Sequence, residues 1–329
     1  MDVDADYATS LLQELVRIDS VNPDLEEDGA GEREIASFTA GAMQEFGLDV
    51  SLFEPEPGRT SVLGRLPGTG DGPSLMLNGH LDTVGVGGMT DPFSGEIREG
   101  RLYGRGAYDM KGGLAACLAA ARALARADLE LPGDLLVSAV SDEEAASLGT
   151  RHLLDEVVPD AAIVTEPTGL DVCVAHKGFA WHTVTTEGRA AHGSRPDLGA
   201  DANLRMARFL AGLDELRREL AGREPHPLLG PPSLHVGILR GGTAPSVYAD
   251  RCRASVEWRT LPGDEVDEAT ERLRELAAEV RRDGSGLECT VELDLERAPF
   301  ETSADAPVVR ALGSVIERRG VGSEVRGEG

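Results

Sequence analysis

The chain has 329 residues, of which 41% are hydrophobic and 27% are charged, and these ordinary globular values exclude the disordered and fibrous classes. Its 58 acidic and 32 basic residues give a formal net charge of −26, which repels phosphate backbones and anionic lipids, so we expect no nucleic-acid partner and no membrane partner. Four scattered cysteines form no CxxC pair, and no basic segment followed by an apolar one opens the chain, so we expect a cytoplasmic protein.

Nearly all the positive charge is on arginine, because Lys111 and Lys177 are the only lysines. An acidic surface with few lysines is typical of proteins that work in concentrated salt, where screening weakens the repulsion between like charges. This pattern predicts a halophilic source. A GC-rich genome would explain the few lysines but not the excess of acids.

The first half of the chain alternates helical and strand-like segments. Apolar residues at helical spacing predict two amphipathic helices near the N-terminus, and short apolar runs predict buried strands further on. This alternation indicates a mostly parallel sheet with helices on both faces. The predicted segments are helices at 11–16 and 35–46, strands at 75–77, 135–140 and 161–164, and a helix at 113–127.

The pattern changes after about residue 175, where a second domain is expected. Its predicted order of strand, helix, strand, strand, helix, strand is that of a ferredoxin-like α+β domain, and Pro299 ends the last strand. The predicted strands are 179–185, 234–239, 255–258 and 289–295, and the helices are 204–220 and 266–280. A helix at 308–316 is expected to rejoin the first domain, which divides the chain into 1–175, 176–296 and 297–329.

Four polar clusters follow predicted strands of the first domain, at residues 78–82, 104–113, 142–144 and 165–168. In open α/β sheets the ligand crevice lies at this edge, and one histidine with several carboxylates is a ligand set for a divalent metal. In a chain so rich in acids, the run 142–144 taken alone is more typical of a solvated surface than of a metal site. In the pair His80-x-Asp82, the carboxylate can accept the second ring N–H of a metal-bound imidazole.

These clusters carry a resemblance to a known family. The segments GHLDTV (79–84), DMKGG (109–113), DEE (142–144) and EPT (166–168) resemble those of the co-catalytic zinc aminoacylases and carboxypeptidases, which include acetylornithine deacetylase and succinyl-diaminopimelate desuccinylase. The resemblance implies a zinc-peptidase-like α/β fold, with a mixed sheet flanked by helices. It also implies an inserted ferredoxin-like dimerisation domain, which makes residues 1–175 the first part of the catalytic domain.

The resemblance also implies a cofactor of two Zn²⁺ or Co²⁺ ions per subunit and a homodimer. Glu143 matches the general base, and Asp82 is the carboxylate beside the histidine ligand. His192 matches a histidine that reaches the partner subunit's site and polarises the amide carbonyl. Arg259 matches the arginine that holds the substrate carboxylate, and Ser246 stands where the family has a substrate-contacting asparagine. The metal ligands carried over in this way are His80, Asp109, Glu144 and Glu166.

The function implied is a metal-dependent amidohydrolase of amino-acid biosynthesis, which removes the acyl group from a small N-acyl amino acid of the acetylornithine or succinyl-diaminopimelate type. The family's second zinc takes a histidine near the C-terminus, whereas the last histidine of this sequence is His235. A C-terminal segment is therefore expected to be missing. The alternative is an inactive or one-metal member that binds a small acyl amino acid without turnover.

Overall fold

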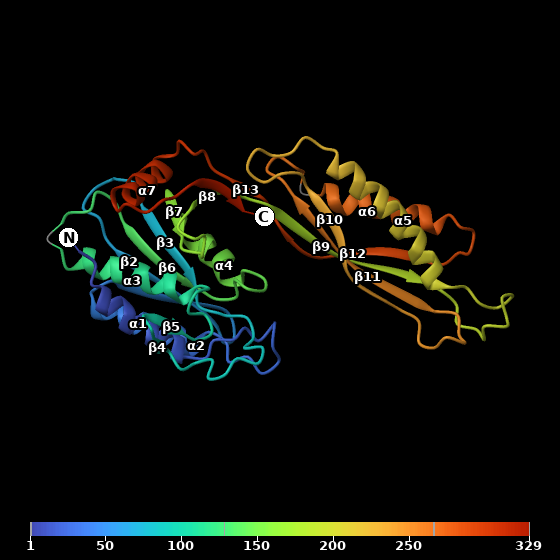
Figure 1. The fold of residues 1–329 in the computed structure, drawn as a ribbon, viewed down its shortest axis with the longest axis horizontal. Coiled ribbons are helices and arrows are strands. Elements are labelled where there is room, and N and C mark those ends of the chain that lie inside the picture. Colours follow the sequence, from blue (N-terminus) through green and yellow to red (C-terminus); the bar gives the residue numbers. More distant parts are fainter. Residues whose placement is uncertain (1, 128, 266, 329) are drawn as a thin grey trace. The chain divides into compact units, whose positions relative to one another are not determined.

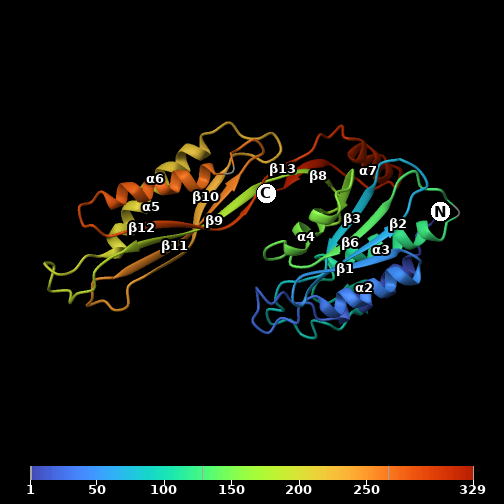
Figure 2. The ribbon, with the colours of Figure 1, turned by 180° about the vertical axis from the view of Figure 1, so that it is seen from behind.

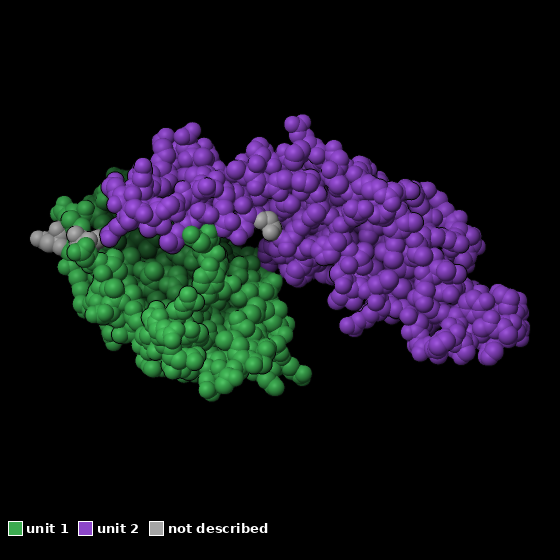
Figure 3. All heavy atoms as spheres, in the orientation of Figure 1, with its two compact units in different colours: residues 1–169 green, residues 170–329 purple. Residues whose placement is uncertain are grey.

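The computed structural model describes residues 2–127, 129–265 and 267–328 of the chain. They form two compact units, residues 1–169 and residues 170–329 (Figure 3). Within the segment expected to rejoin the first domain, residues 300–301, 307–318 and 325–328 pack with β8 (Val172–His176). The predicted domain boundaries at 175 and 296 stay predictions.

The first unit contains a five-stranded mixed sheet in the order β1-β2-β6-β3-β7. Strand β3 pairs in parallel with β6 and β7, whereas β2 pairs antiparallel with β1 and β6. The mixed sheet implied by the resemblance is confirmed, and the mostly parallel sheet predicted from the alternation is wrong. The hairpin of β1 and β2 was not predicted because β1 is exposed and polar and lacks an apolar run. The strands are β1 (Asp49–Glu56), β2 (Arg59–Leu66), β3 (Leu75–His80), β6 (Leu135–Val140) and β7 (Ala161–Val164), with a small hairpin of β4 (Glu96–Arg98) and β5 (Arg101–Tyr103).

Helices cover both faces of this sheet (Figures 1 and 2). One face packs against three helices through a core that includes Leu15, Met43, Leu118 and Val137. The opposite face packs against a fourth helix through Leu153. Strand β6 is therefore buried along its whole length, as its continuous apolar run predicts. The helices on the first face are α1 (Ala5–Arg17), α2 (Arg33–Glu45) and α3 (Lys111–Ala125), and the helix on the second is α4 (Leu148–Glu156).

The N-terminal turn of α3 lies very close to the end of β7. A Cβ built on Gly113 would stand 2.2 Å from the carbonyl oxygen of Thr165. Only glycine leaves room for this approach. The contact matters for position, because Asp109 lies just before α3 and Glu166 just after β7.

The second unit contains a four-stranded antiparallel sheet in the order β10-β11-β9-β12. Helices α5 and α6 pack on one face around Trp258, Phe209 and Leu273. The elements follow the predicted order, although Val266, predicted to begin the second helix, lies outside the described residues. A dimerisation role for this unit stays a prediction. The elements are β9 (Gly178–Glu187), α5 (Ala202–Ala221), β10 (Ser233–Gly241), β11 (Arg251–Thr260), α6 (Glu268–Arg281) and β12 (Cys289–Arg297).

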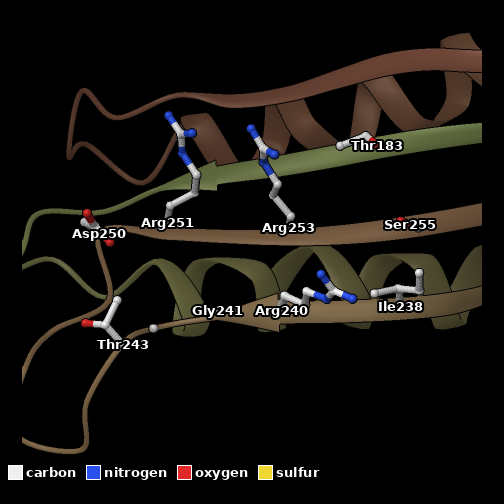
Figure 4. A pocket seen from close by; sticks show the side chains of 10 residues that line it. Thr183, Ile238, Arg240, Gly241, Thr243, Asp250, Arg251, Arg253 and Ser255 are labelled. Carbon is white, nitrogen blue, oxygen red and sulfur yellow. The ribbon is translucent and has the colours of Figure 1, made fainter. Parts of the chain in front are cut away.

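Two further features complete the second unit. Strand β8 pairs with β13 (Phe300–Glu301) and β14 (Val325–Glu328) under α7 (Pro307–Arg318). An open hollow of about 520 Å³ lies over β10 and β11, and the side chains of Arg251 and Arg253 lie side by side there (Figure 4).

Across the part of the chain that the structure describes, every helix is too short or too polar to cross a lipid bilayer.

We predict that Gly113→Ala destabilises the first unit although alanine is the better helix former. Propensity favours alanine by about 1 kcal/mol, but the added methyl group would overlap the Thr165 carbonyl, and such overpacking costs about 1–3 kcal/mol. Gly41→Ala in α2 is the matched control, because its Cβ meets nothing within 4 Å, and it is expected to stabilise. Urea unfolding measures both. Equal stabilisation by the two substitutions would show that the close approach is absent.

Candidate metal centre

His80 occupies the last position of β3 and is 1% exposed. Its Nδ1 lies 2.8 Å from the backbone oxygen of Asp82, to which it can donate its proton, so Nε2 is the ring atom available to a metal ion. That nitrogen lies 3.3 Å from Asp109 Oδ1 and 3.7 Å from Glu166 Oε1. The local fold thus presents one imidazole nitrogen to two carboxylates from separate segments.

The donor set fits a divalent cation. Among the described residues, His80, Asp109 and Glu166 form the cluster whose ligand atoms all lie within 4.8 Å of one another. Metal–ligand bonds of about 2 Å place neighbouring ligand atoms roughly 3 to 4 Å apart, close to the separations seen here. One neutral imidazole and two carboxylates suit zinc and similar borderline cations.

The charges of this cluster are out of balance without a cation. Burial raises the pKa of Glu166 to about 7. The nearby carboxylates of Glu143 and Asp109 raise this pKa further, and the His80 imidazole opposes the rise. Burial is also the main cause that raises the pKa of Glu144 to about 7 and that of Glu143 above its ordinary value. The hydrogen bond with His80 lowers the pKa of Asp109. A bound divalent cation would stabilise all four groups in their charged forms.

Asp82 is placed differently from the expectation for a His-x-Asp pair. Its backbone oxygen, and not its carboxylate, accepts the close hydrogen bond from His80, and Oδ1 lies 3.6 Å from Nδ1. The carboxylate instead accepts the backbone N–H groups of Glu143 at 3.0 Å and of Glu144 at 3.1 Å. Asp82 therefore joins the end of β3 to the loop after β6.

The loop after β6 brings both candidate glutamates to the cluster. A carboxylate oxygen of Glu143 lies 3.9 Å from His80 Nε2, and the side chain is 45% exposed, so a water molecule can reach it. Glu144 is half-buried, and its carboxyl interacts electrostatically with His80 and Asp109. Asp142 is buried, so the solvated surface considered for this acidic run is wrong for its first residue.

The remaining candidate residues belong to the second unit and are described within it. His192 and Val247 form an isolated β-bridge, so His192 and Ser246 lie in adjoining loops. The ring of His192 is exposed, and its Nδ1 lies 2.9 Å from Ser194 Oγ. Arg259 pairs with Glu257 at 3.1 Å and lies over the ring of Phe179. Their functional roles stay predictions.

Sequence reasoning missed three buried polar residues behind the loop at residues 142–144, called the glutamate loop below: Asn22, Glu32 and Arg59. Asn22 donates to Asp82 Oδ2 at 2.8 Å, and Arg59 contacts both Glu32 and Asp142. All three lie outside the predicted helices and strands, so no sequence signal marked them. Contacts between residues so far apart in the chain leave no periodic pattern.

An α/β sheet whose parallel strands end at a buried histidine ringed by carboxylates is the architecture of a hydrolytic enzyme. The chain belongs to peptidase family M20/M25/M40, whose family model matches residues 76–329. Acetylornithine deacetylase of Myxococcus xanthus is 36% identical over 251 residues, which is 74% of this chain and 65% of that protein. The same enzyme of Aliivibrio fischeri (strain MJ11) is 29% identical over 310 residues, which is 92% of this chain and 81% of that protein.

A third relative is N-formyl-4-amino-5-aminomethyl-2-methylpyrimidine deformylase of Bacillus subtilis (strain 168), 31% identical over 73% of this chain and 61% of that protein. Among solved structures, the M20 family metallo-carboxypeptidase Sso-CP2 from Sulfolobus solfataricus shares the fold with a TM-score of 0.80, 20% identity and coverage of 100% of this chain and 86% of that chain. The Bacillus subtilis YXEP protein, a dinuclear metal-binding peptidase, has a TM-score of 0.70 at 14% identity, over 99% of this chain and 84% of that chain.

We predict that the metal-free chain loses stability as the pH rises from about 4.5 to 7. The folded-state pKa is raised from 4.5 to about 7 for Glu32, Glu144 and Glu166, so the folded chain holds more protons than the unfolded chain in this window. Stability is therefore highest at the acidic end. Above pH 7 the raised pKa of His80, about 9, and the lowered pKa of Lys111, about 7, change the stability in opposite directions. Thermal melts after chelation should give a lower Tm at about pH 7 than at about pH 5.

The same melts with zinc added test the centre itself. Zinc must displace the protons of Glu144 and Glu166, so its gain in Tm should be larger at the higher pH. The gain should disappear in Glu166→Gln and persist in Glu45→Gln, an exposed glutamate of α2. A metal-free Tm that stays constant or rises over this pH range would contradict the electrostatic description.

Proposed function

We propose that the chain is a metal-dependent amide hydrolase that removes the acyl group from a small N-acyl amino acid. The observation that carries this proposal is the meeting of His80, Asp109 and Glu166 within 4.8 Å, with a Glu143 carboxylate oxygen 3.9 Å from the imidazole. A metal-ligand set with a partly exposed carboxylate beside it is what hydrolysis by an activated water needs.

His80, Asp109, Glu144 and Glu166 would hold two divalent cations, zinc or cobalt. When bound, these ions supply Lewis-acid activation of the water and of the amide carbonyl. The description of the YXEP protein as a dinuclear metal-binding peptidase supports two ions. His80 is suited to its part because its Nδ1 can donate to the Asp82 carbonyl, which leaves Nε2 available to a metal ion.

Glu143 is the proposed general base and then general acid. Its carboxylate takes a proton from the attacking water, and the oxygen of that water bonds to the acyl carbon. When the C–N bond breaks, the same proton passes to the departing amine, and the products are a carboxylate and a free amino acid. Burial raises the pKa of Glu143, which moves this carboxyl toward the range in which it can both accept and return a proton.

The proposed substrate class is a small N-acyl amino acid, with acetylornithine as the first candidate and succinyl-diaminopimelate as the second. Two relatives are named as acetylornithine deacetylases and a third as a deformylase, and these names share the removal of a small acyl group from an amine. An enzyme of amino-acid biosynthesis in the cytoplasm fits this chemistry. The acid excess supports a setting of concentrated salt.

In the second unit, Arg259 is proposed to bind the substrate carboxylate, with Ser246 as a nearby contact. A guanidinium matches a carboxylate with two parallel hydrogen bonds. His192 is proposed to reach the partner subunit's site in a homodimer and to polarise the amide carbonyl. Its exposed ring supports this role. An inactive or one-metal protein is not proposed, because the curated relatives are named as enzymes.

We predict that Glu143→Gln loses at least about 100-fold in kcat while binding zinc as the parent does, because the amide cannot accept the proton of the attacking water. Hydrolysis of N-acetylornithine and metal content per chain are the measurements. Glu45→Gln, the same substitution at an exposed site, should behave like the parent. Parent-like turnover in Glu143→Gln would remove this residue from the mechanism, and a parent inactive on N-acyl amino acids would overturn the proposed substrate class.

A further inference from the structure

The glutamate loop at residues 142–144 rests on a buried ionic network centred on Arg59. Arg59 begins β2 and is 5% exposed, and its two main partners, Glu32 and Asp142, are 0% and 1% exposed. The guanidinium contacts Asp142 Oδ1 through Nη2, and its Nη1 lies 3.3 Å from Glu32 Oε1. One cation thus joins the N-terminal end of α2 to the residue that precedes Glu143.

Asp142 is held through its backbone and its side chain together. Its N–H donates to Glu32 Oε1 at 3.1 Å, and its Oδ2 accepts from the backbone N–H of Leu148 at 3.2 Å. Its φ is 62°, in the left-handed region that costs a residue with a side chain about 1 kcal/mol or more. The surrounding bonds hold the backbone in this conformation, which sets the direction in which the chain enters Glu143.

Asn22 connects this network to the metal centre. Its Nδ2 donates to Asp142 Oδ1 at 3.1 Å and to Asp82 Oδ2 at 2.8 Å, and its Oδ1 accepts from Arg59 Nη2 at 3.1 Å. Asp82 in turn accepts the N–H groups of both glutamates. An unbroken chain of hydrogen bonds therefore runs from Arg59 to the backbone of Glu143 and Glu144.

We propose that Arg59 is a positioning residue, which acts through Asp142 and Asn22 to fix the backbone of Glu143 and Glu144 beside His80. The proposal rests on the proposed function, because the orientation matters only if Glu143 moves a proton and Glu144 binds metal. Arg59 itself lies behind the loop and reaches the centre only through Asp142 and Asn22.

Stability alone does not account for this arrangement. Burying an arginine with two acids costs desolvation energy that ion pairing roughly offsets, and apolar side chains of similar volume are often as stable. The network instead fixes the orientation of the loop, because the guanidinium presents several N–H groups in a rigid plane. Lysine has the same charge but a single ammonium group, so it cannot contact Glu32, Asp142 and Asn22 together in the same geometry.

Hydrogen exchange of the metal-free 329-residue chain tests the positioning directly. In Arg59→Lys the amides of Glu143 and Glu144 should exchange about tenfold faster than in the parent, because the loop opens locally, while the amides of residues 136–139 in β6 should keep their parent rates. Arg65→Lys is the matched control on the same strand, where an exposed arginine pairs with Asp134 at 2.6 Å, and it should leave both sets unchanged.

Kinetics of the zinc-loaded chain give the second measurement. Arg59→Lys should lower kcat by about 100-fold at unchanged metal content, with KM within about threefold of the parent, because a displacement of about 1 Å at the base slows the chemical step. If Arg59→Lys fails to fold, Asp142→Asn takes its place. Asparagine has the same shape and tolerates the positive φ, so the same exchange and kinetic effects are expected.

Two results would overturn the proposal. Parent rates of exchange at residues 143 and 144 would show that Arg59 does not hold the loop, and parent kcat per zinc-loaded molecule would show that its hold is irrelevant to catalysis. Equal acceleration at residues 136–139 would show a general loss of stability and would also overturn it. A parent chain without amide hydrolase activity would contradict the proposed function, and the exchange experiment would still decide whether Arg59 positions the loop.

Discussion

The parallel pairing of β3 with β6 and β7 is the constraint on which the candidate centre depends. Because the three strands run in one direction, their carboxyl ends meet at one edge, and the chain delivers His80, the glutamate loop and Glu166 there. Asp109 arrives separately, at the start of α3. The close approach of Gly113 to Thr165 holds that helix end against the same edge.

The charges at this edge explain why the centre has supports of two kinds. Four carboxyl groups surround one imidazole, and burial opposes their ionisation. The Asp82 carboxylate accepts hydrogen bonds from the backbone N–H groups of Glu143 and Glu144. It therefore holds the glutamate loop through the backbone and needs no positively charged side chain as a partner. Arg59 neutralises negative charge of the acids behind the loop, and a divalent cation would neutralise the carboxylates around His80. The positive charge is thus divided between a fixed arginine and an exchangeable ion.

The fold was predictable wherever apolar residues carry a clear period. Strands β6 and β7 and helices α1, α2 and α5 lie where the sequence places them, because their apolar side chains recur at regular spacing. Only β6 is buried along its length, whereas β7 is half-exposed at the edge of the sheet. Strand β1 was missed because its side chains are mostly exposed and polar, so its hairpin with β2 is held by backbone pairing and leaves a weak signal. Strand β2 was missed as well, although it is mostly buried, and its antiparallel pairing with β6 makes the sheet mixed.

The sequence by itself determined which residues could form the centre, because His80, Asp109, Glu143 and Glu166 stand at predicted strand and helix ends within motifs that resemble those of one family. Only the tertiary structure decided how they are held. In the folded chain, His80 Nδ1 contacts the Asp82 carbonyl and the Asp82 carboxylate accepts the N–H of Glu143. Arg59 is buried behind the glutamate loop, in contact with Asp142. Of these contacts, the one between Arg59 and Asp142 joins residues 83 positions apart in the chain. A hydrogen bond between distant segments depends on distance and direction in space, and a linear pattern of side chains contains neither.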